Sequence, residues 1–334
     1  MDCPSDIVDR FGLGAVRRCR RIEHGYISET WDVTTDSGRY AVRNRPPSHG
    51  DPNMVRAQHR LMLHLARMGF PVPRLVCGGS GETFVVEGDA CYEIQTWIDG
   101  GHCDDRRPTH RAAAARTLAA YHCAVDGFDD PQLHQHVARY HPQRLALIAG
   151  ELAMGTTPDV APAFVSPVDR LVAHADDLHL RLVAFDQLPT LVIHGDYYGQ
   201  NLLFKGDEVS GLVDYDQAHW APRIVEVAEA LIYFGREALG ADSSPARFHH
   251  IVYDGWVDVT LAAQFLRTYL EVAPLTQREL RVLPDVMRLI WLSASLRPPL
   301  ELPLSSGNRE ALKEVVALAD WAHAHAAGIV TAAR

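Results

Sequence analysis

The sequence predicts an α+β fold of two lobes: a small N-terminal lobe with a mixed β-sheet and one main helix, and a larger, mostly helical C-terminal lobe. Two observations lead to this prediction. Short β-prone runs and turn residues are concentrated before Trp97, and alanine- and leucine-rich segments dominate the rest. The change occurs near Trp97–Gly101, so we divide the chain into residues 1–97 and 98–334. The junction of two such lobes is a common place for a ligand.

The small lobe begins with a predicted β-hairpin over residues 20–43. Two β-prone runs there flank Thr-Asp-Ser-Gly at positions 35–38, which is a good turn sequence. Residues 54–68 predict a helix, because apolar residues recur on one stripe and two prolines follow it. Two more strands are expected at residues 83–87 and 91–97. This order describes a small sheet with one helix packed against it.

The large lobe is predicted to be helical because its segments are rich in alanine, leucine and arginine, which are strong helix formers. One compact β-like stretch, Thr190–Asp216, interrupts these helices. The helical segments are expected at residues 109–124, 161–185, 222–237, 256–271 and 308–327.

Composition excludes several classes of protein. The chain has 334 residues, of which 47% are hydrophobic and 22% charged, as in ordinary soluble globular proteins. The net charge of −10 argues against a nucleic-acid partner bound by a basic surface. No uninterrupted apolar stretch approaches the ~18 to 20 residues of a membrane span, so no membrane contact is expected. The N-terminus lacks the basic and apolar regions of a signal peptide, which favours a cytoplasmic location.

Cysteine, lysine and histidine usage narrows the possible sites further. The six cysteines form no C-x-x-C pair, so we expect reduced thiols. Lysine occurs only at Lys205 and Lys313, and neither precedes a Ser or Thr, which excludes a P-loop nucleotide site. Histidine pairs such as His134 and His136 lack the spacing of zinc ligands.

The most informative segment runs from Leu191 to Phe204. An apolar run enters it and another leaves it, so we expect His194 to Asn201 to form a tight loop between buried strands. A second apolar strand then ends at Asp214. The pattern is H-x-D-x-x-x-x-N, followed by an apolar strand with a terminal Asp.

Phosphoryl transfer explains why these residue types occur together, because the reaction needs positioning and charge neutralisation more than covalent help. A carboxylate, here Asp196, accepts or orients the proton of the attacking hydroxyl. Hard oxygen ligands, here Asn201 and Asp214, hold Mg²⁺. The alternative is that Asp196 and Asn201 are ordinary loop-capping residues.

These motifs resemble those of the superfamily of aminoglycoside phosphotransferases, homoserine kinases and choline kinases, which is related in fold to protein kinases. The resemblance runs from about His24 to Phe234. It implies a protein-kinase-like fold, a nucleotide triphosphate (ATP or GTP) with Mg²⁺, and a small-molecule hydroxyl acceptor. It also implies that Asp196 is the base, that Asn201 and Asp214 hold the metal, and that His194 orients the loop.

Two helices add to the resemblance. The segment Ile224–Ala228 is similar to the family's D-L-A helix, with Glu226 in place of the usual Asp. Leu118–His122 is similar to its helix that ends in L-x-x-x-H.

The nucleotide side departs more from the family. The turn at His24–Glu29 should cover the phosphates through backbone amides, with Gly25 and Ser28 as candidates; the alternative is a plain hairpin turn. The next strand should supply a lysine, but Arg43 stands there, with Arg45 as the alternative cation.

The helix of the small lobe should then offer a carboxylate to steady that cation. Gln58 stands at that position instead, on the stripe with Leu61, Leu65 and Met68. It either contacts Arg43 or lies at the edge of the stripe, and we favour the edge.

The strand at residues 92–98 resembles the family's hinge, whose backbone around Gln95 and Trp97 would bind the nucleobase. Trp97 is otherwise a core aromatic residue. For the acceptor, Tyr197, Tyr198 and Trp220 are candidate walls, and Asp216 either touches metal or substrate or is a surface carboxylate.

The predicted function is therefore transfer of a γ-phosphoryl group to a hydroxyl of an antibiotic, homoserine, an amino sugar or an amino alcohol. The alternatives are a bacterial Ser/Thr protein kinase of the same superfamily and a catalytically dead nucleotide-binding module. The sequence does not indicate an oligomeric state.

Overall fold

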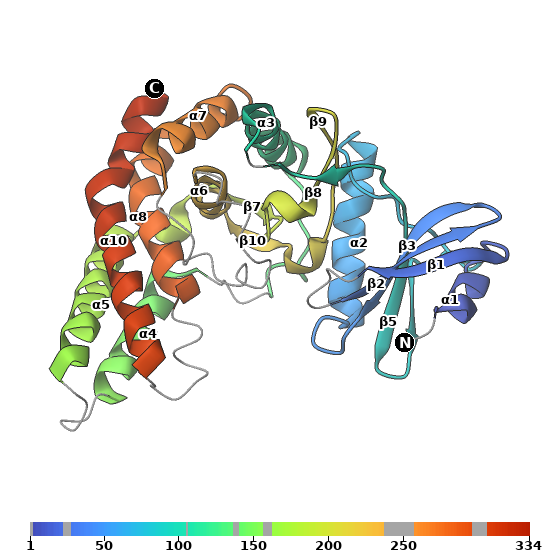
Figure 1. Ribbon diagram of the computed structural model, residues 1–334, viewed down its shortest axis with the longest axis horizontal. Helices are drawn as coiled ribbons and strands as arrows, with labels where there is room; N and C mark the ends of the chain where they lie inside the picture. The colour runs from blue at the N-terminus through green and yellow to red at the C-terminus, as the bar shows by residue number, and fades with distance from the viewer. Residues whose placement is uncertain are drawn as a thin grey trace.

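The computed structural model describes residues 3–22, 28–104, 106–135, 140–155, 162–236, 257–295 and 306–334. The chain forms a small lobe built on a β-sheet and a large, mainly helical lobe, which lie side by side (Figure 1). This arrangement confirms the predicted α+β, two-lobed fold. The predicted boundary falls between strand β5, which ends at Thr96, and the short strand β6, Gly101–His102.

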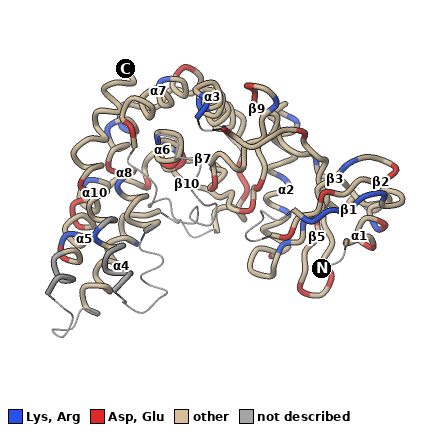
Figure 2. The backbone as a smooth tube through the Cα atoms, in the orientation of Figure 1, with Lys and Arg blue, Asp and Glu red and all other residues tan. Residues whose placement is uncertain are grey.

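The small lobe contains an antiparallel sheet of five strands in the order β1-β2-β3-β5-β4. The predicted hairpin is present as β2 and β3, and it turns at Gly38. Strand β1 is an edge strand and carries four arginines, which Figure 2 shows as a blue stretch. Charged side chains on an edge strand discourage pairing with other chains. The strands are β1 Val16–Ile22, β2 Glu29–Thr35, β3 Gly38–Arg45, β4 Phe84–Glu87 and β5 Ala90–Thr96.

Helix α2, Pro52–Arg67, corresponds to the helix predicted at residues 54–68. Asp51 caps it by accepting a hydrogen bond from the Asn53 backbone N–H. Leu61 and Leu65 are buried as expected, but Met68 is 59% exposed because it lies just beyond the last helical turn. The expectation that Met68 belongs to the buried stripe is therefore wrong.

A short helix that the sequence analysis does not predict, α1 (Ser5–Arg10), closes the outer face of the sheet. Its Ile7 and Val8 are buried in one apolar cluster with Trp31 and Val33 of β2. Burial of apolar side chains on both partners stabilises this contact.

The cysteines correct one expectation. Cys3 and Cys19 form a disulfide that links the segment before α1 to β1, so two of the six cysteines are not thiols. Their separation of 16 residues carried no C-x-x-C signal. The other four, Cys77, Cys91, Cys103 and Cys123, are free, and only Cys91 is buried.

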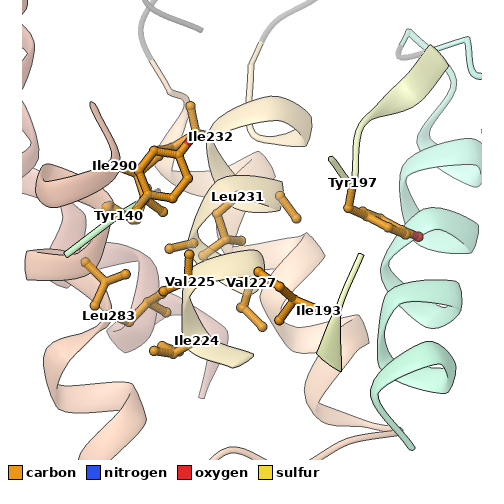
Figure 3. Close-up of a cluster of buried hydrophobic side chains, with 14 of the residues drawn as sticks. Tyr140, Ile193, Tyr197, Ile224, Val225, Val227, Leu231, Ile232, Leu283 and Ile290 are labelled. Atoms are coloured by element: carbon orange, nitrogen blue, oxygen red, sulfur yellow. The ribbon is translucent and has the colours of Figure 1, made fainter. Parts of the chain in front are cut away.

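The large lobe surrounds helix α6, whose buried side chains Val225, Val227 and Leu231 pack near Leu283 and Ile290 of α8 (Figure 3). Two helices in the described parts of this lobe, α4 and α8, were not predicted. Pro284 inside α8 interrupts the sequence signal for a helix. The helices are α3 Pro108–Ala124, α4 Pro142–Gly155, α5 Pro162–Arg181, α6 Arg223–Phe234, α7 Val259–Leu270, α8 Gln277–Ser295 and α10 Ser306–Ala333.

The β-like stretch predicted at Thr190–Asp216 is confirmed as three short strands and the loops between them. Strand β7, Thr190–Ile193, pairs with β10, His219–Pro222. Strands β8, Leu202–Lys205, and β9, Glu208–Leu212, form a second small sheet with β6. These strands lie at the junction of the lobes in Figure 1 and position the loops described next.

Helix α10 has an apolar C-terminal half, although Asp320 and His323 interrupt it and leave no continuous apolar stretch of the kind excluded from the sequence. Its segment Val315–Ala333 is long and apolar enough to span a membrane by length and composition. The helix packs against α5, α7 and α8, and its Asp320 pairs with Arg170 and His174. Of the residues in the segment, 39% are buried inside the fold.

Candidate active site

His194 fixes the start of the predicted catalytic loop. Its ring is fully buried, and Nε2 donates a hydrogen bond to the Val213 carbonyl at 3.0 Å. Burial lowers the pKa of His194, so the neutral ring joins the end of β7 to the residue before Asp214. This contact agrees with the expectation that His194 orients the loop.

Gly195 makes the close approach that the loop requires. Its φ is +79°, and a Cβ atom there would lie 2.2 Å from the Gln217 carbonyl oxygen, so only glycine fits. Its N–H donates to Oε1 of the buried Glu226 at 2.8 Å. The other Glu226 oxygen accepts from His122 Nε2 at 2.9 Å. The helix motifs that contain His122 and Glu226 therefore meet behind the loop.

Asp196, which is partly exposed, lies beside the buried Asn201 in the loop. The Asn201 side-chain amide Nδ2 donates to Asp196 Oδ2 at 2.8 Å and to the Asp196 carbonyl at 2.9 Å. Because Nδ2 faces Asp196, the amide oxygen of Asn201 faces the opposite way and is a suitable metal ligand. The Asp196 side chain is partly exposed, as a group that meets a substrate must be.

Asp214 follows β9 in a left-handed conformation, with φ of 67°, and no other non-glycine residue in the described ranges has a positive φ. Its side chain is 43% exposed. Burial of part of the group and the nearby Asp216 carboxylate raise the pKa of Asp214 to about 7. The Val213 N–H donates to the Asn201 carbonyl at 2.9 Å, which brings the two predicted metal ligands together.

The donor set fits Mg²⁺. An amide oxygen and a carboxylate are hard ligands, and Mg²⁺ is usually bound by one or two carboxylates together with phosphates and water. Among the residues that the structure describes, no group of three or more His, Cys, Asp or Glu could hold a metal ion. A metal at Asn201 and Asp214 would therefore share its coordination with the substrate phosphates.

Arg43 lies on β3 and points toward the loop, but carboxylates surround it. Nη1 donates to Glu93 Oε1 at 2.7 Å and to Asp216 Oδ1 at 3.0 Å. Nη2 donates to Asp214 Oδ1 and to Asp216 Oδ2, both at 3.0 Å. The guanidinium thus presents two parallel N–H groups to Asp216, which is the geometry that it would offer to a phosphate.

Arg45 and Gln58 correct two expectations. Arg45 is fully buried and pairs with Glu93 and Asp216, at 2.9 and 3.0 Å, so it is not an accessible alternative cation. Gln58 is also buried rather than at the edge of the stripe, because its Oε1 accepts from Arg45 and its Nε2 donates to the Asp216 carbonyl. The glutamine has a charged partner, but that partner is Arg45 and not Arg43.

Asp216 is neither a surface carboxylate nor a wall of the acceptor site. It faces the small lobe, where Ser28 Oγ donates to Oδ2 at 3.2 Å and both arginines bind it. Ser28 therefore contacts a carboxylate in this structure. Gly25, the other candidate of the hairpin turn, lies outside the described residues.

Two backbone N–H groups of the predicted hinge already donate hydrogen bonds within the protein. The backbone N–H of Thr96 donates to the Arg74 carbonyl, and that of Trp97 donates to the Arg39 carbonyl. The Gln95 side chain is buried and donates to Glu93. Trp97 is not a core residue: it is partly exposed, and the Arg39 guanidinium lies 4.0 Å from its ring centroid. Nucleobase contacts to the N–H groups of 96 and 97 are therefore not supported.

The candidate acceptor residues divide into two groups. Tyr197 is wrong as a wall, because its ring is fully buried and its hydroxyl donates to the Ala114 carbonyl of α3 (Figure 3). Tyr198 is partly exposed and lies against Tyr233 of α6, with 5.5 Å between the ring centroids. Trp220 is also partly exposed and stacks on His134 at 4.5 Å.

Comparison with known proteins decides the family. The sequence matches the phosphotransferase enzyme family over residues 18–279. The chain belongs to this family. It is thus a small-molecule phosphotransferase, and this membership favours an active enzyme over a dead nucleotide-binding module.

Individual proteins that are similar to this chain are also kinases. The chain is 26% identical to a homoserine kinase of Methylobacillus flagellatus over 289 residues, which cover 85% of this chain and 81% of that protein. Its fold is similar to an amicoumacin kinase solved with AMP-PNP and Ca²⁺, with a TM-score of 0.67, 13% identity and coverage of 95% and 93%. A microcompartment-associated aminopropanol kinase gives a TM-score of 0.65, 13% identity and coverage of 98% and 97%.

Glu93 is the residue of this phosphotransferase that sequence reasoning missed. It lies on β5, directly opposite Arg43 on β3. The signal that could have found it is the alternation of Tyr92-Glu93-Ile94-Gln95, in which two polar residues share one face of an otherwise apolar strand. That face turns toward Arg43.

Proposed function

We propose that this phosphotransferase moves the γ-phosphoryl group of ATP, with Mg²⁺, to the hydroxyl of a small amino alcohol, with homoserine as the first candidate. The observation that supports the reaction is the pairing of Asp196 with Asn201 beside Asp214. Likeness to a homoserine kinase along most of both chains supports the acceptor class.

Asp196 has the role of accepting or orienting the acceptor hydroxyl proton. Asn201 donates to its Oδ2 and so fixes the orientation of a carboxylate that is partly exposed beside the junction of the lobes. Asn201 and Asp214 would hold Mg²⁺, which neutralises charge on the phosphates as the phosphoryl group leaves. Arg43 would bind a phosphate through the two N–H groups that Asp216 accepts in this structure. Tyr198 and Trp220 remain candidate walls for the acceptor.

The test is nucleotide consumption with a panel of acceptors, each at the same concentration. The panel contains homoserine, 1-amino-2-propanol, choline, glucosamine, kanamycin and an unstructured Ser/Thr-rich peptide, with ATP or GTP as donor. Phosphorus NMR of the product identifies the modified hydroxyl. Turnover of homoserine or another amino alcohol, abolished by Asp196→Asn, supports the proposal.

Two other outcomes contradict it. Turnover confined to kanamycin or glucosamine would assign the site to an antibiotic or sugar acceptor. Turnover of the peptide alone would instead indicate a protein kinase. If GTP supports faster turnover than ATP at equal concentration, the donor is misassigned while the acceptor class stands.

A further inference from the structure

Glu93 is a completely buried carboxylate on which four side chains converge. Oε1 accepts from Arg43 Nη1 at 2.7 Å and from Gln95 Nε2 at 2.9 Å. Oε2 accepts from Arg45 Nε at 3.0 Å and contacts His59 Nε2 at 2.7 Å. A buried charge is tolerated only when it is paired and hydrogen-bonded, and Glu93 meets both conditions.

Helix α2 cannot provide a carboxylate to pair with Arg43. Its sixteen residues, Pro52–Arg67, contain no Asp and no Glu. The polar residues that it directs into the charged cluster are Gln58, which binds Arg45, and His59, which contacts Glu93. Among the described residues of the small lobe, the carboxylate that contacts Arg43 is Glu93, which comes from the sheet.

The sheet holds Arg43 and Glu93 in fixed relation. They are opposite each other in the antiparallel pairing of β3 with β5, so their side chains leave the same face at neighbouring positions. The Glu93 bond uses one hydrogen of Nη1. The guanidinium still directs one N–H from Nη1 and one from Nη2 away from the sheet, toward Asp216.

We infer that Glu93 is the positioning residue that orients Arg43 for the nucleotide phosphates, in the role that a helix carboxylate would otherwise have. The inference rests on the proposed function only in assigning nucleotide phosphates to Arg43. Glu93 holds the guanidinium from behind, and the two forward N–H groups exchange the Asp216 carboxylate for two phosphate oxygens. Arg43 matches both partners because carboxylate and phosphate accept parallel hydrogen bonds in the same way.

The first test is Glu93→Gln, which keeps the shape and removes the charge. The measurement is the Kd of ADP and ATP by calorimetry, without any acceptor. We expect binding to weaken roughly 10- to 100-fold, as for a lost charged hydrogen bond. Glu87→Gln is the matched control, because Glu87 lies on the neighbouring strand β4 and pairs only with exposed Arg10 among the described residues. We expect its Kd to equal that of the wild type.

Glu93→Asp provides a second variant, in case removal of the charge prevents folding. It keeps the charge of the cluster but withdraws the carboxylate by one methylene group from Arg43. We expect a folded protein, by its circular dichroism and melting temperature, with a raised Kd. Unchanged affinity in either folded variant overturns the inference.

A double variant separates positioning from simple charge balance. Gln58→Glu in the Glu93→Gln background returns one carboxylate to the cluster, next to Arg45. If Glu93 acts by direct contact with Arg43, the melting temperature recovers while nucleotide affinity remains low. If both recover together, net charge is what matters and Glu93 is not a positioning residue.

The acceptor does not enter these measurements. A chain that binds ADP with the expected differences but fails to phosphorylate homoserine overturns the proposed acceptor and leaves the role of Glu93 intact.

Discussion

The side-chain amide of Asn201 donates to two oxygens of Asp196, the carboxylate Oδ2 at 2.8 Å and the backbone carbonyl at 2.9 Å. One interaction thus sets the direction of both groups. The Asp196 carboxylate is held beside Asn201, and the Asn201 amide oxygen faces away from Asp196.

Asp196→Asn should fold and bind nucleotide normally but lose turnover by about 10²- to 10⁴-fold, the contribution of a positioned base. Steady-state kinetics with the best acceptor from the panel measure this. Asp207→Asn, on an exposed turn beside Arg107, is the control and should leave kcat unchanged. Equal turnover in the Asp196 variant and the wild type would remove Asp196 from the mechanism.

Asp214→Asn should weaken the dependence of nucleotide binding on Mg²⁺, because a formal charge is lost from the metal ligands. Asparagine tolerates the left-handed backbone at this position, so the fold should persist. Asn201→Ala should have a smaller effect, since it removes a neutral ligand. Titrating Mg²⁺ against ADP affinity compares the three proteins. An unaltered Mg²⁺ midpoint in Asp214→Asn would exclude it as a ligand.

Arg45→Met should destabilise the protein by about 3–5 kcal/mol, because it leaves buried acidic partners without a counter-charge. Arg45 is fully buried against Glu93 and Asp216. Urea unfolding measures the change. Arg18→Met on the exposed strand β1 is the comparison and should stay within ~0.5 kcal/mol of the wild type. Similar stability of both variants would contradict the role given to Arg45.

Gly195→Ala should lower both the melting temperature and kcat. The added Cβ would lie 2.2 Å from the Gln217 carbonyl oxygen at a φ of +79°, so the loop must shift and move Asp196. Gly206→Ala is a matched control for backbone strain, because its φ is +66° but nothing lies within 4 Å of the added atom. We expect only stability to fall there. If kcat falls equally in both, the close approach to Gln217 is not what positions the loop.

Acid should destabilise the helical lobe through His174. Burial, and next the nearby Arg288 charge, lower the pKa of His174 to about 4, whereas an unfolded histidine titrates near ~6.5. Between these values the unfolded state binds more protons, so stability falls as pH drops from ~6.5 to ~4. We expect a loss on the order of 1–2 kcal/mol, because the group is only half-buried. Urea unfolding at pH 7 and pH 4.5 tests this, and His174→Asn should flatten the difference. An identical pH slope in the variant would exclude His174.

The sequence predicted the loop from His194 to Asn201 between two buried strands because its signal is local. His194, Asp196 and Asn201 fall within eight positions between two apolar strands, and short-range spacing fixes their relation. The same local pattern did not distinguish Tyr197, which is buried against α3, from Tyr198, which is partly exposed. Neighbouring loop residues follow no periodic alternation, so their burial depends on how the distant helix packs.

The charged cluster was harder to predict because it depends on pairing between strands. Arg43 and Glu93 are 50 residues apart, and Arg43 and Asp216 are 173 apart. Neither distance leaves a spacing signal in a single sequence. The Cys3–Cys19 disulfide was missed for a related reason. No local pattern in the sequence indicates that the segment before α1 lies against the strand that carries Cys19.

The carboxylate opposite Arg43 lies on a strand and not on a helix, and this has a consequence for control. In protein kinases the corresponding ion pair joins a strand to a helix, and displacing the helix turns the enzyme off. Moving α2 away here would break the contacts of Gln58 with Arg45 and Asp216 and that of His59 with Glu93, while Arg43 and Glu93 would stay paired inside one sheet. A displacement of α2 would therefore not separate the ion pair of this small lobe, in contrast to the pair that joins a strand to a helix in protein kinases.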